Sequence, residues 1–101
     1  MSYKFQRVVS FKGTDYIVKA PSKTDNKKYD VFIEDEGKEK KILSFGHTDY
    51  QHFKDRLGYW KHLDHNDPKR QENYKSRHSK DKGVIYNDPK YSGWWSYHLL
   101  W

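Results

Sequence analysis

Basic and aromatic side chains recur at helical spacing in residues 69–78, directly after the sequence Asn66-Asp67-Pro68. Arg70, Tyr74 and Arg77 are three or four residues apart, so a helix would place them on one face. Guanidinium groups neutralise phosphates, and a tyrosine ring can stack on a base. The segment therefore predicts nucleic-acid binding through phosphates, with these candidate contacts: Arg70, Tyr74, Lys75, Arg77 and His78. A solvated helix face anchored by Tyr74 is the alternative interpretation.

A second basic zone lies near the N-terminus. The net charge is +6 and the pI is about 9.4. Two basic zones, residues 1–28 and 54–82, flank an acidic segment, residues 29–53. This distribution favours acidic partners such as nucleic acid. The first zone supplies three further candidate phosphate contacts: Arg7, Lys12 and Lys19.

The C-terminal segment, residues 91–101, is the most apolar part of the chain. A helix would place Trp94, Tyr97 and Trp101 on one face, which predicts a core contact. Trp95 and Leu99 would lie on another face, for which core packing and contact with a partner protein are equally good interpretations. Trp95 and Leu99 are therefore the candidate partner interface.

Two histidines and two aspartates fall within residues 62–67. Metal ligands occur at such spacing, but His62 and His65 straddle the expected end of a helix and no distant third ligand is marked. A structural role is the favoured interpretation, because histidine at a helix C-terminus interacts favourably with the helix dipole. No metal is expected.

The chain carries none of the motifs that identify common catalytic sites. It has no glycine-rich phosphate loop, no G-x-S-x-G and no H-E-x-x-H, and its paired carboxylates occur only in one acidic turn. Cysteine is absent, which excludes thiol nucleophiles and cysteine-based zinc sites. We therefore expect a non-enzymatic protein with no catalytic residues and no cofactor.

Length and composition predict one small domain, residues 1–101, whose core depends on aromatic rings. Hydrophobic residues make up 34% of the sequence and aromatic residues 18%. Each ring can bury about 150–250 Å², so few are needed. No segment has the apolar length of a membrane span or a signal peptide, so we expect a protein that is not secreted and has no transmembrane segment.

Hydrophobic periodicity predicts an α+β fold. Residues 1–46 read as β-hairpins, with strands at 4–12, 16–18, 29–33 and 40–45. Residues 47–101 read as helical: Tyr50, Phe53, Leu57 and Trp60 form a helical stripe within 48–63, and the two Asn-Asp-Pro-Lys sequences begin helices near 68 and 89. The expected architecture is a small antiparallel sheet of about four strands, packed by two to three short helices.

The order of several short motifs resembles a family of small uncharacterised proteins from large DNA viruses and marine tailed phages. The likeness covers about residues 28–101. It rests on Ser44-Phe45-Gly46, on Arg70, Tyr74 and Arg77-His78, and on the closing segment from Trp94-Trp95-Ser96 to Leu99-Leu100-Trp101. The resemblance implies a viral or phage source and a virion- or genome-associated role, in the virion or the host-cell cytoplasm. It supplies no catalytic residues.

Three functional hypotheses follow. The first is a virus-encoded basic protein that binds nucleic acid through its phosphates. The second is a virion structural protein, such as a minor capsid, cement or adaptor subunit, that acts through its Trp-rich C-terminus. The third is a host-takeover factor that binds a host protein. The sequence favours the first because the positive charge is concentrated in two zones.

Overall fold

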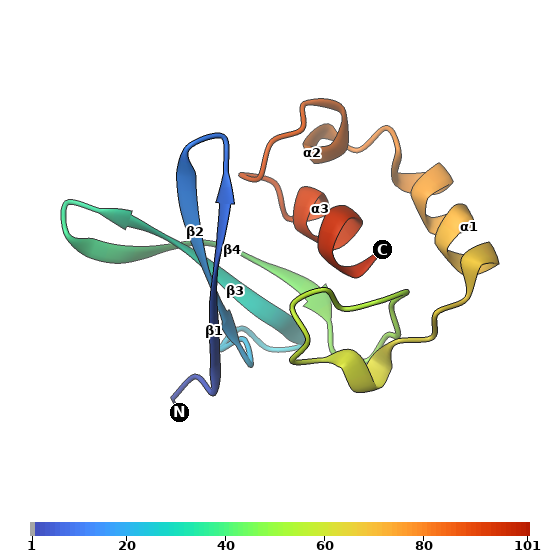
Figure 1. Cartoon of the computed structure of the whole chain (residues 1–101), viewed down its shortest axis with the longest axis horizontal. Coiled ribbons are helices and arrows are strands. Elements are labelled where there is room, and N and C mark those ends of the chain that lie inside the picture. The colour runs from blue at the N-terminus through green and yellow to red at the C-terminus, as the bar shows by residue number, and fades with distance from the viewer. Residues whose placement is uncertain (1) are drawn as a thin grey trace. The chain divides into compact units, whose positions relative to one another are not determined.

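The computed structural model describes residues 2–101 (Figure 1). The chain divides into two compact units, the first ending at His47 and the second covering Thr48–Trp101. A four-stranded antiparallel sheet occupies the N-terminal half, and short helices follow it. The predicted α+β class is confirmed.

The first unit is an antiparallel meander. Its strands are β1 (Phe5–Phe11), β2 (Thr14–Ala20), β3 (Lys27–Asp35) and β4 (Lys38–His47), and each lies beside the next one in sequence (Figure 1). Two tight turns set the hairpins. Lys12 and Gly13 both have positive φ, at 50° and 82°, and so do Glu36 and Gly37, at 52° and 78°. Two successive residues with positive φ are the requirement of a type I′ turn, whose twist matches that of paired strands.

Strand register assigns the side chains to two faces. Val18 of β2 lies opposite Val31 of β3, and both are fully buried. Lys19 lies opposite Asp30, so these two share the other face. The register shifts after Val31, where Ile42 is an extra residue in β4. Because of this bulge, the alternation of β4 side chains between the two faces of the sheet shifts by one residue at Ile42, while the alternation in β3 is unbroken.

The second face carries a buried carboxylate. The Asp30 side chain has no exposed surface and accepts hydrogen bonds from the Tyr3 hydroxyl at 2.6 Å, the Ser44 hydroxyl at 2.6 Å and the Lys23 N–H at 2.9 Å. The Ser22 hydroxyl also donates to it. Burial alone would raise the pKa of Asp30, but these donors together hold it well below its usual range. Asp30 therefore stays ionised inside the sheet unit.

In the second unit, α1 (Pro68–His78) forms as its sequence predicts. The Asp67 carboxylate accepts hydrogen bonds from the N–H groups of Lys69 and Arg70 at 3.0 and 3.4 Å, and Pro68 occupies the first helical position. The basic residues of the last turn lie near the negative end of the helix dipole. Local signals are sufficient to define this helix.

The helix predicted over residues 48–63 is wrong. The segment is irregular apart from the single turn η1 (Lys61–Leu63). Asp55 accepts hydrogen bonds from the N–H groups of Leu57 and Trp60, and Gly58 has a φ of 97°. Asp64 accepts one from the Asp55 N–H at 2.8 Å. Carboxylates thus replace the helical carbonyls as acceptors, which is how aspartate competes with helix formation.

The second Asn-Asp-Pro-Lys sequence does not begin a helix at Pro89. The Asp88 carboxylate accepts the Lys90 N–H at 2.9 Å and closes a local turn instead. The remaining helical elements are α2 (Lys82–Ile85), α3 (Ser92–Trp95) and the π-helical segment η2 (Ser96–Leu100). The Trp101 N–H donates to the Ser96 carbonyl at 3.1 Å, which closes the wide turn.

Close backbone approach joins α2 to α3. Gly83 is buried, and a Cβ at this position would lie 2.8 Å from the Tyr91 Cβ and 2.9 Å from the Trp94 nitrogen. Glycine is therefore required at this contact.

Within residues 2–101, no helix has the length and apolar character needed to cross a membrane.

Candidate nucleic-acid interface

One face of α1 borders a hollow of about 230 Å³. Arg70, Asn73 and Arg77 line it together with Trp101 from the end of the chain. Asn73 and both arginines are exposed, and Trp101 is half-buried. The helix supplies the polar wall through its three- and four-residue spacing. Trp101, which the sequence assigned to core packing, supplies the aromatic wall.

The two guanidinium groups beside this hollow have no carboxylate partner in the part of the chain that the structure describes. Arg70 donates to the neutral Gln51 Oε1 at 3.0 Å. Among the described residues, no carboxylate forms an ion pair with Arg70 or Arg77. The pair is therefore available to an external anion, and guanidinium geometry suits phosphate oxygens.

Tyr74 is committed to an internal stack. Its ring lies 4.2 Å from the Trp101 ring, with the two planes 4° from parallel, and 4.2 Å from the His78 ring on a tilt of 30°. Burial, followed by the negative charge of Asp81, raises the pKa of the Tyr74 phenol to about 12. Tyr74 supports Trp101 at the hollow, and its own faces are already covered by rings.

Arg70, Asn73 and Arg77 lie on one face of α1, which we call the arginine face. Lys75 and His78 lie outside it. The Lys75 Nζ lies 5.0 Å from the centroid of the Tyr97 ring, and Lys75 is half-buried. The His78 Nδ1 is 2.8 Å from the Asp81 Oδ2. Five residues separate Lys75 from Arg70, which on a helix is about 140° of rotation. The segment thus presents two differently directed basic surfaces.

The three candidate residues of the first zone do not form one patch within the sheet unit. Arg7 lies opposite Val18, whereas Lys19, the neighbour of Val18 in β2, points to the other face. Lys12 lies in the β1–β2 turn. Lys19 also forms an ion pair with Glu39 and lies over the Phe32 ring. Arg7 and Lys12 are exposed, and Lys19 is already partnered.

The residues of the candidate partner interface are poorly accessible. Trp95 is fully buried, and its indole N–H donates to the Pro89 carbonyl at 2.7 Å. Leu99 is half-buried. A partner could touch Trp95 only after it became exposed, so a partner role for these two residues stays a prediction that their surroundings do not support.

The predicted histidine cluster has a structural arrangement. The His65 Nδ1 accepts the Asp67 N–H at 3.0 Å, and the ring lies 5.2 Å from Trp101. Burial, followed by the charge of Arg70, lowers the pKa of His65. His62 is exposed and lies against Trp60. Over residues 2–101, no three His, Asp or Glu side chains converge as a metal site would require.

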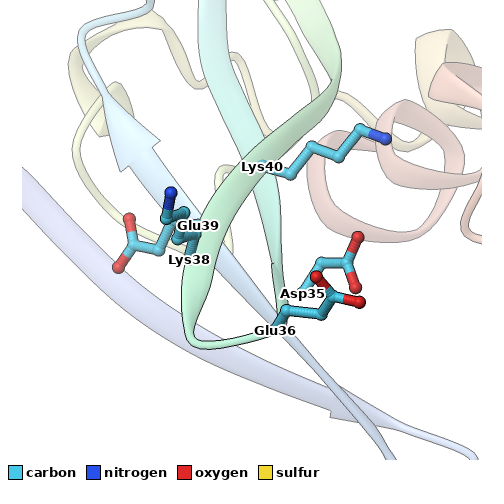
Figure 2. A pocket seen from close by; sticks show the side chains of 5 residues that line it. All are labelled: Asp35, Glu36, Lys38, Glu39 and Lys40. Atoms are coloured by element: carbon cyan, nitrogen blue, oxygen red, sulfur yellow. The ribbon is translucent and has the colours of Figure 1, made fainter.

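A second hollow, of about 370 Å³, lies at the β3–β4 hairpin tip in the first unit. Figure 2 shows the Asp35 and Glu36 carboxylates close together on one side of the hairpin, Lys38 and Glu39 on the other side, and Lys40 apart from both pairs. The lining residues are Asp35, Glu36, Lys38, Glu39 and Lys40. This lining has mixed charge and no aromatic wall, so it lacks the features that distinguish the hollow beside α1.

Comparison with known proteins gives no independent assignment. No family model matches the chain, and no curated protein or solved structure matches it significantly. The resemblance to viral and phage proteins therefore stays a prediction.

Proposed function

We propose that this protein is a non-enzymatic nucleic-acid-binding protein that contacts phosphates through the arginine face of α1. The observation that carries the proposal is the hollow in which Arg70, Asn73 and Arg77 face the Trp101 ring. Two guanidinium groups that form no ion pair with the described residues, an amide and an aromatic wall make a combination suited to a nucleotide strand. Two guanidinium groups would not be expected beside a hollow that binds an apolar ligand.

The geometry favours contact with the phosphate backbone of a nucleic acid over recognition of individual bases. Seven residues separate the arginines, which is about 10.5 Å along a helix axis, so the two groups can neutralise different phosphates of one strand. Asn73 can donate to a phosphate or sugar oxygen, and the Trp101 ring can border a base. Such contacts are weakly dependent on sequence and strongly dependent on salt.

The proposed biological setting comes from the resemblance to viral and phage proteins. A genome-associated or virion-associated role in an infected cell would give such a protein abundant nucleic acid as a partner. Arg7 and Lys12 are exposed and would add charge from the sheet unit. Lys19 is omitted from the proposed contacts because Glu39 already neutralises it.

Fluorescence anisotropy with labelled duplex DNA, single-stranded DNA and RNA tests the proposal. We expect binding that weakens linearly in a plot of log affinity against log salt. The Arg70→Gln, Arg77→Gln double variant should reduce the slope by about 1.8 for duplex DNA and about 1.4 for single strands, because each neutralised phosphate contributes about 0.9 or 0.7.

A matched control separates the site from total charge. The Lys38→Gln, Lys40→Gln double variant removes the same charge from exposed positions at the β3–β4 hairpin. We expect it to retain nearly the full salt slope. Equal loss in both double variants would mean that binding follows net charge, and the arginine face would then be rejected as the site.

A further inference from the structure

The Trp101 ring is held in place beside the arginine face. The Tyr74 ring covers one face of it in a parallel stack at 4.2 Å, and the Gln71 side chain donates to the Trp101 carbonyl at 2.8 Å. The His65 ring packs against Trp101 at 5.2 Å with a tilt of 55°. His65 is itself oriented by the Asp67 N–H, which donates to its Nδ1 at 3.0 Å. Several contacts therefore position the ring before any ligand arrives.

Part of Trp101 remains accessible at the hollow. Trp101 is half-buried, and it is the one aromatic residue among those that line the hollow. The His65 ring is tilted, so it does not cover Trp101 with a second parallel stack. A ring that is already positioned loses little side-chain freedom when a ligand binds to it. The hollow therefore offers two kinds of contact, guanidinium groups for phosphates and an aromatic surface for a base.

We propose that the ligand of this hollow is a single strand whose unpaired base contacts Trp101 while its phosphates contact Arg70 and Arg77. In a duplex each base is paired and lies between its neighbours in the stack, so its faces are closed to a protein ring. An unpaired base can turn away from its neighbours and stack on an aromatic side chain. Only a single strand can therefore use both walls of the hollow at once. This inference rests on the proposed function, because the phosphate contacts of the arginine face bring the base to Trp101.

Charge alone predicts the opposite preference. A duplex carries about twice the charge of a single strand per unit length, and each phosphate contact contributes about 0.9 to the salt slope for a duplex and about 0.7 for a single strand. A surface that contacted only phosphates would bind a duplex at least as tightly as a single strand of the same length. Stacking of one base on an aromatic side chain changes affinity by about 5- to 150-fold. Tighter binding of the single strand would therefore indicate the base contact.

Three ligands of equal length test the inference on the protein without substitutions. They are oligothymidylate, its duplex with oligoadenylate, and an abasic strand that keeps every phosphate but carries no bases. Fluorescence anisotropy at one salt concentration should show that oligothymidylate binds more tightly than the duplex, and at least about fivefold more tightly than the abasic strand. Equal affinities for oligothymidylate and the abasic strand would overturn the inference and leave the phosphate contacts of the proposed function intact. Absence of binding to all three ligands would reject the proposed function as well.

Substitutions of Trp101 locate the base contact. Trp101→Leu should reduce the ratio of the affinities for oligothymidylate and the abasic strand to about one, whereas Trp101→Phe retains a ring and should keep most of the preference. The ratio is taken within each variant, so a moderate loss of folded protein affects both affinities equally. Circular dichroism at the assay temperature measures the folded fraction. A preference for bases that survives in folded Trp101→Leu protein would contradict the proposed contact.

Tyr86 provides a matched control. It is an aromatic residue of the same unit, it is 63% exposed, and it lies outside the lining of the hollow. Tyr86→Leu should leave both the preference for bases and the salt slope unchanged. Loss of the preference in Tyr86→Leu, with its retention in Trp101→Leu, would place the stacked base on the exposed tyrosine and overturn the assignment to the hollow.

Discussion

Tyr74 and Trp101 stack face to face, with ring centroids 4.2 Å apart and planes within 4° of parallel. The contact joins the middle of α1 to Trp101, the residue that follows η2. Gln71, one turn earlier in α1, donates from Nε2 to the Trp101 carbonyl at 2.8 Å. Ring stacking and a hydrogen bond therefore fix Trp101 where it forms the wall of the arginine-lined hollow.

Loss of the Trp101 ring should destabilise the second unit. We expect Trp101→Ala to lower the free energy of unfolding by about 2 kcal/mol, because it removes a half-buried ring and an aromatic pair. Tyr74→Phe is the matched control, since it keeps the stack and removes only a hydroxyl, and it should cost less than about 1 kcal/mol. Urea unfolding followed by circular dichroism measures both, and equal losses would show that the stack itself contributes little.

Gly83 should be the least replaceable glycine of the helical unit. A Cβ there would lie under 3 Å from Tyr91 and from the Trp94 backbone, so Gly83→Ala should cost about 1–3 kcal/mol through overpacking. Gly93→Ala is the control, because its nearest neighbour would be the Asp81 Oδ2 at 3.7 Å. Within α3, alanine should be neutral or stabilising by up to about 1 kcal/mol. Thermal unfolding of the two variants should shift the midpoint in different directions or by clearly different amounts.

Features set by short-range chemistry could be predicted from the sequence. The β3–β4 hairpin follows from alternating side chains and from the Glu36-Gly37 turn, whereas β1 ends at Phe11, one residue before its expected end, and its turn lies at Lys12-Gly13. The start of α1 follows from Asp67 and Pro68. The shared face of Arg70 and Arg77 then follows from helical spacing alone.

Features set by distant segments could not be predicted in this way. The N–H groups of Lys54 and Arg56 donate to the carbonyls of Leu100 and Leu99, about 45 residues later in the chain. These bonds, with the Asp55 and Asp64 carboxylates, override a helical stripe that is present in the sequence. The position of Trp101 at the hollow depends on the same long-range pairing. One local signal was available: aspartate can accept nearby N–H groups, and residues 48–63 contain two aspartates, with Asp64 directly after them.

The buried Asp30 carboxylate should make the sheet unit sensitive to acid. Its pKa in the folded chain lies below the ordinary value of 3.8, because four donors stabilise the ionised form against the opposing effect of burial. A lowered folded pKa gives stabilisation that is fully present above the unfolded pKa. That stabilisation is lost as the pH falls through the folded value. Stability should therefore decline below about pH 4.

Asp30→Asn tests this account. The variant keeps the shape of the side chain but removes its charge, including attraction to the Lys41 Nζ at 3.3 Å. We expect a loss of about 1–3 kcal/mol at pH 7 and a weaker dependence of stability on pH below 4. Asp25→Asn is the matched control, because Asp25 is an exposed acid in the loop before β3 and the change of charge is identical. Urea unfolding at pH 7, 4 and 3 should show the largest difference between the two variants at pH 7 and a smaller difference at pH 3, because the unfolded chain binds a proton at Asp30 in acid and part of the stabilisation is then lost. A constant difference between the variants at all three pH values would instead assign the loss to altered hydrogen bonding that does not depend on ionisation.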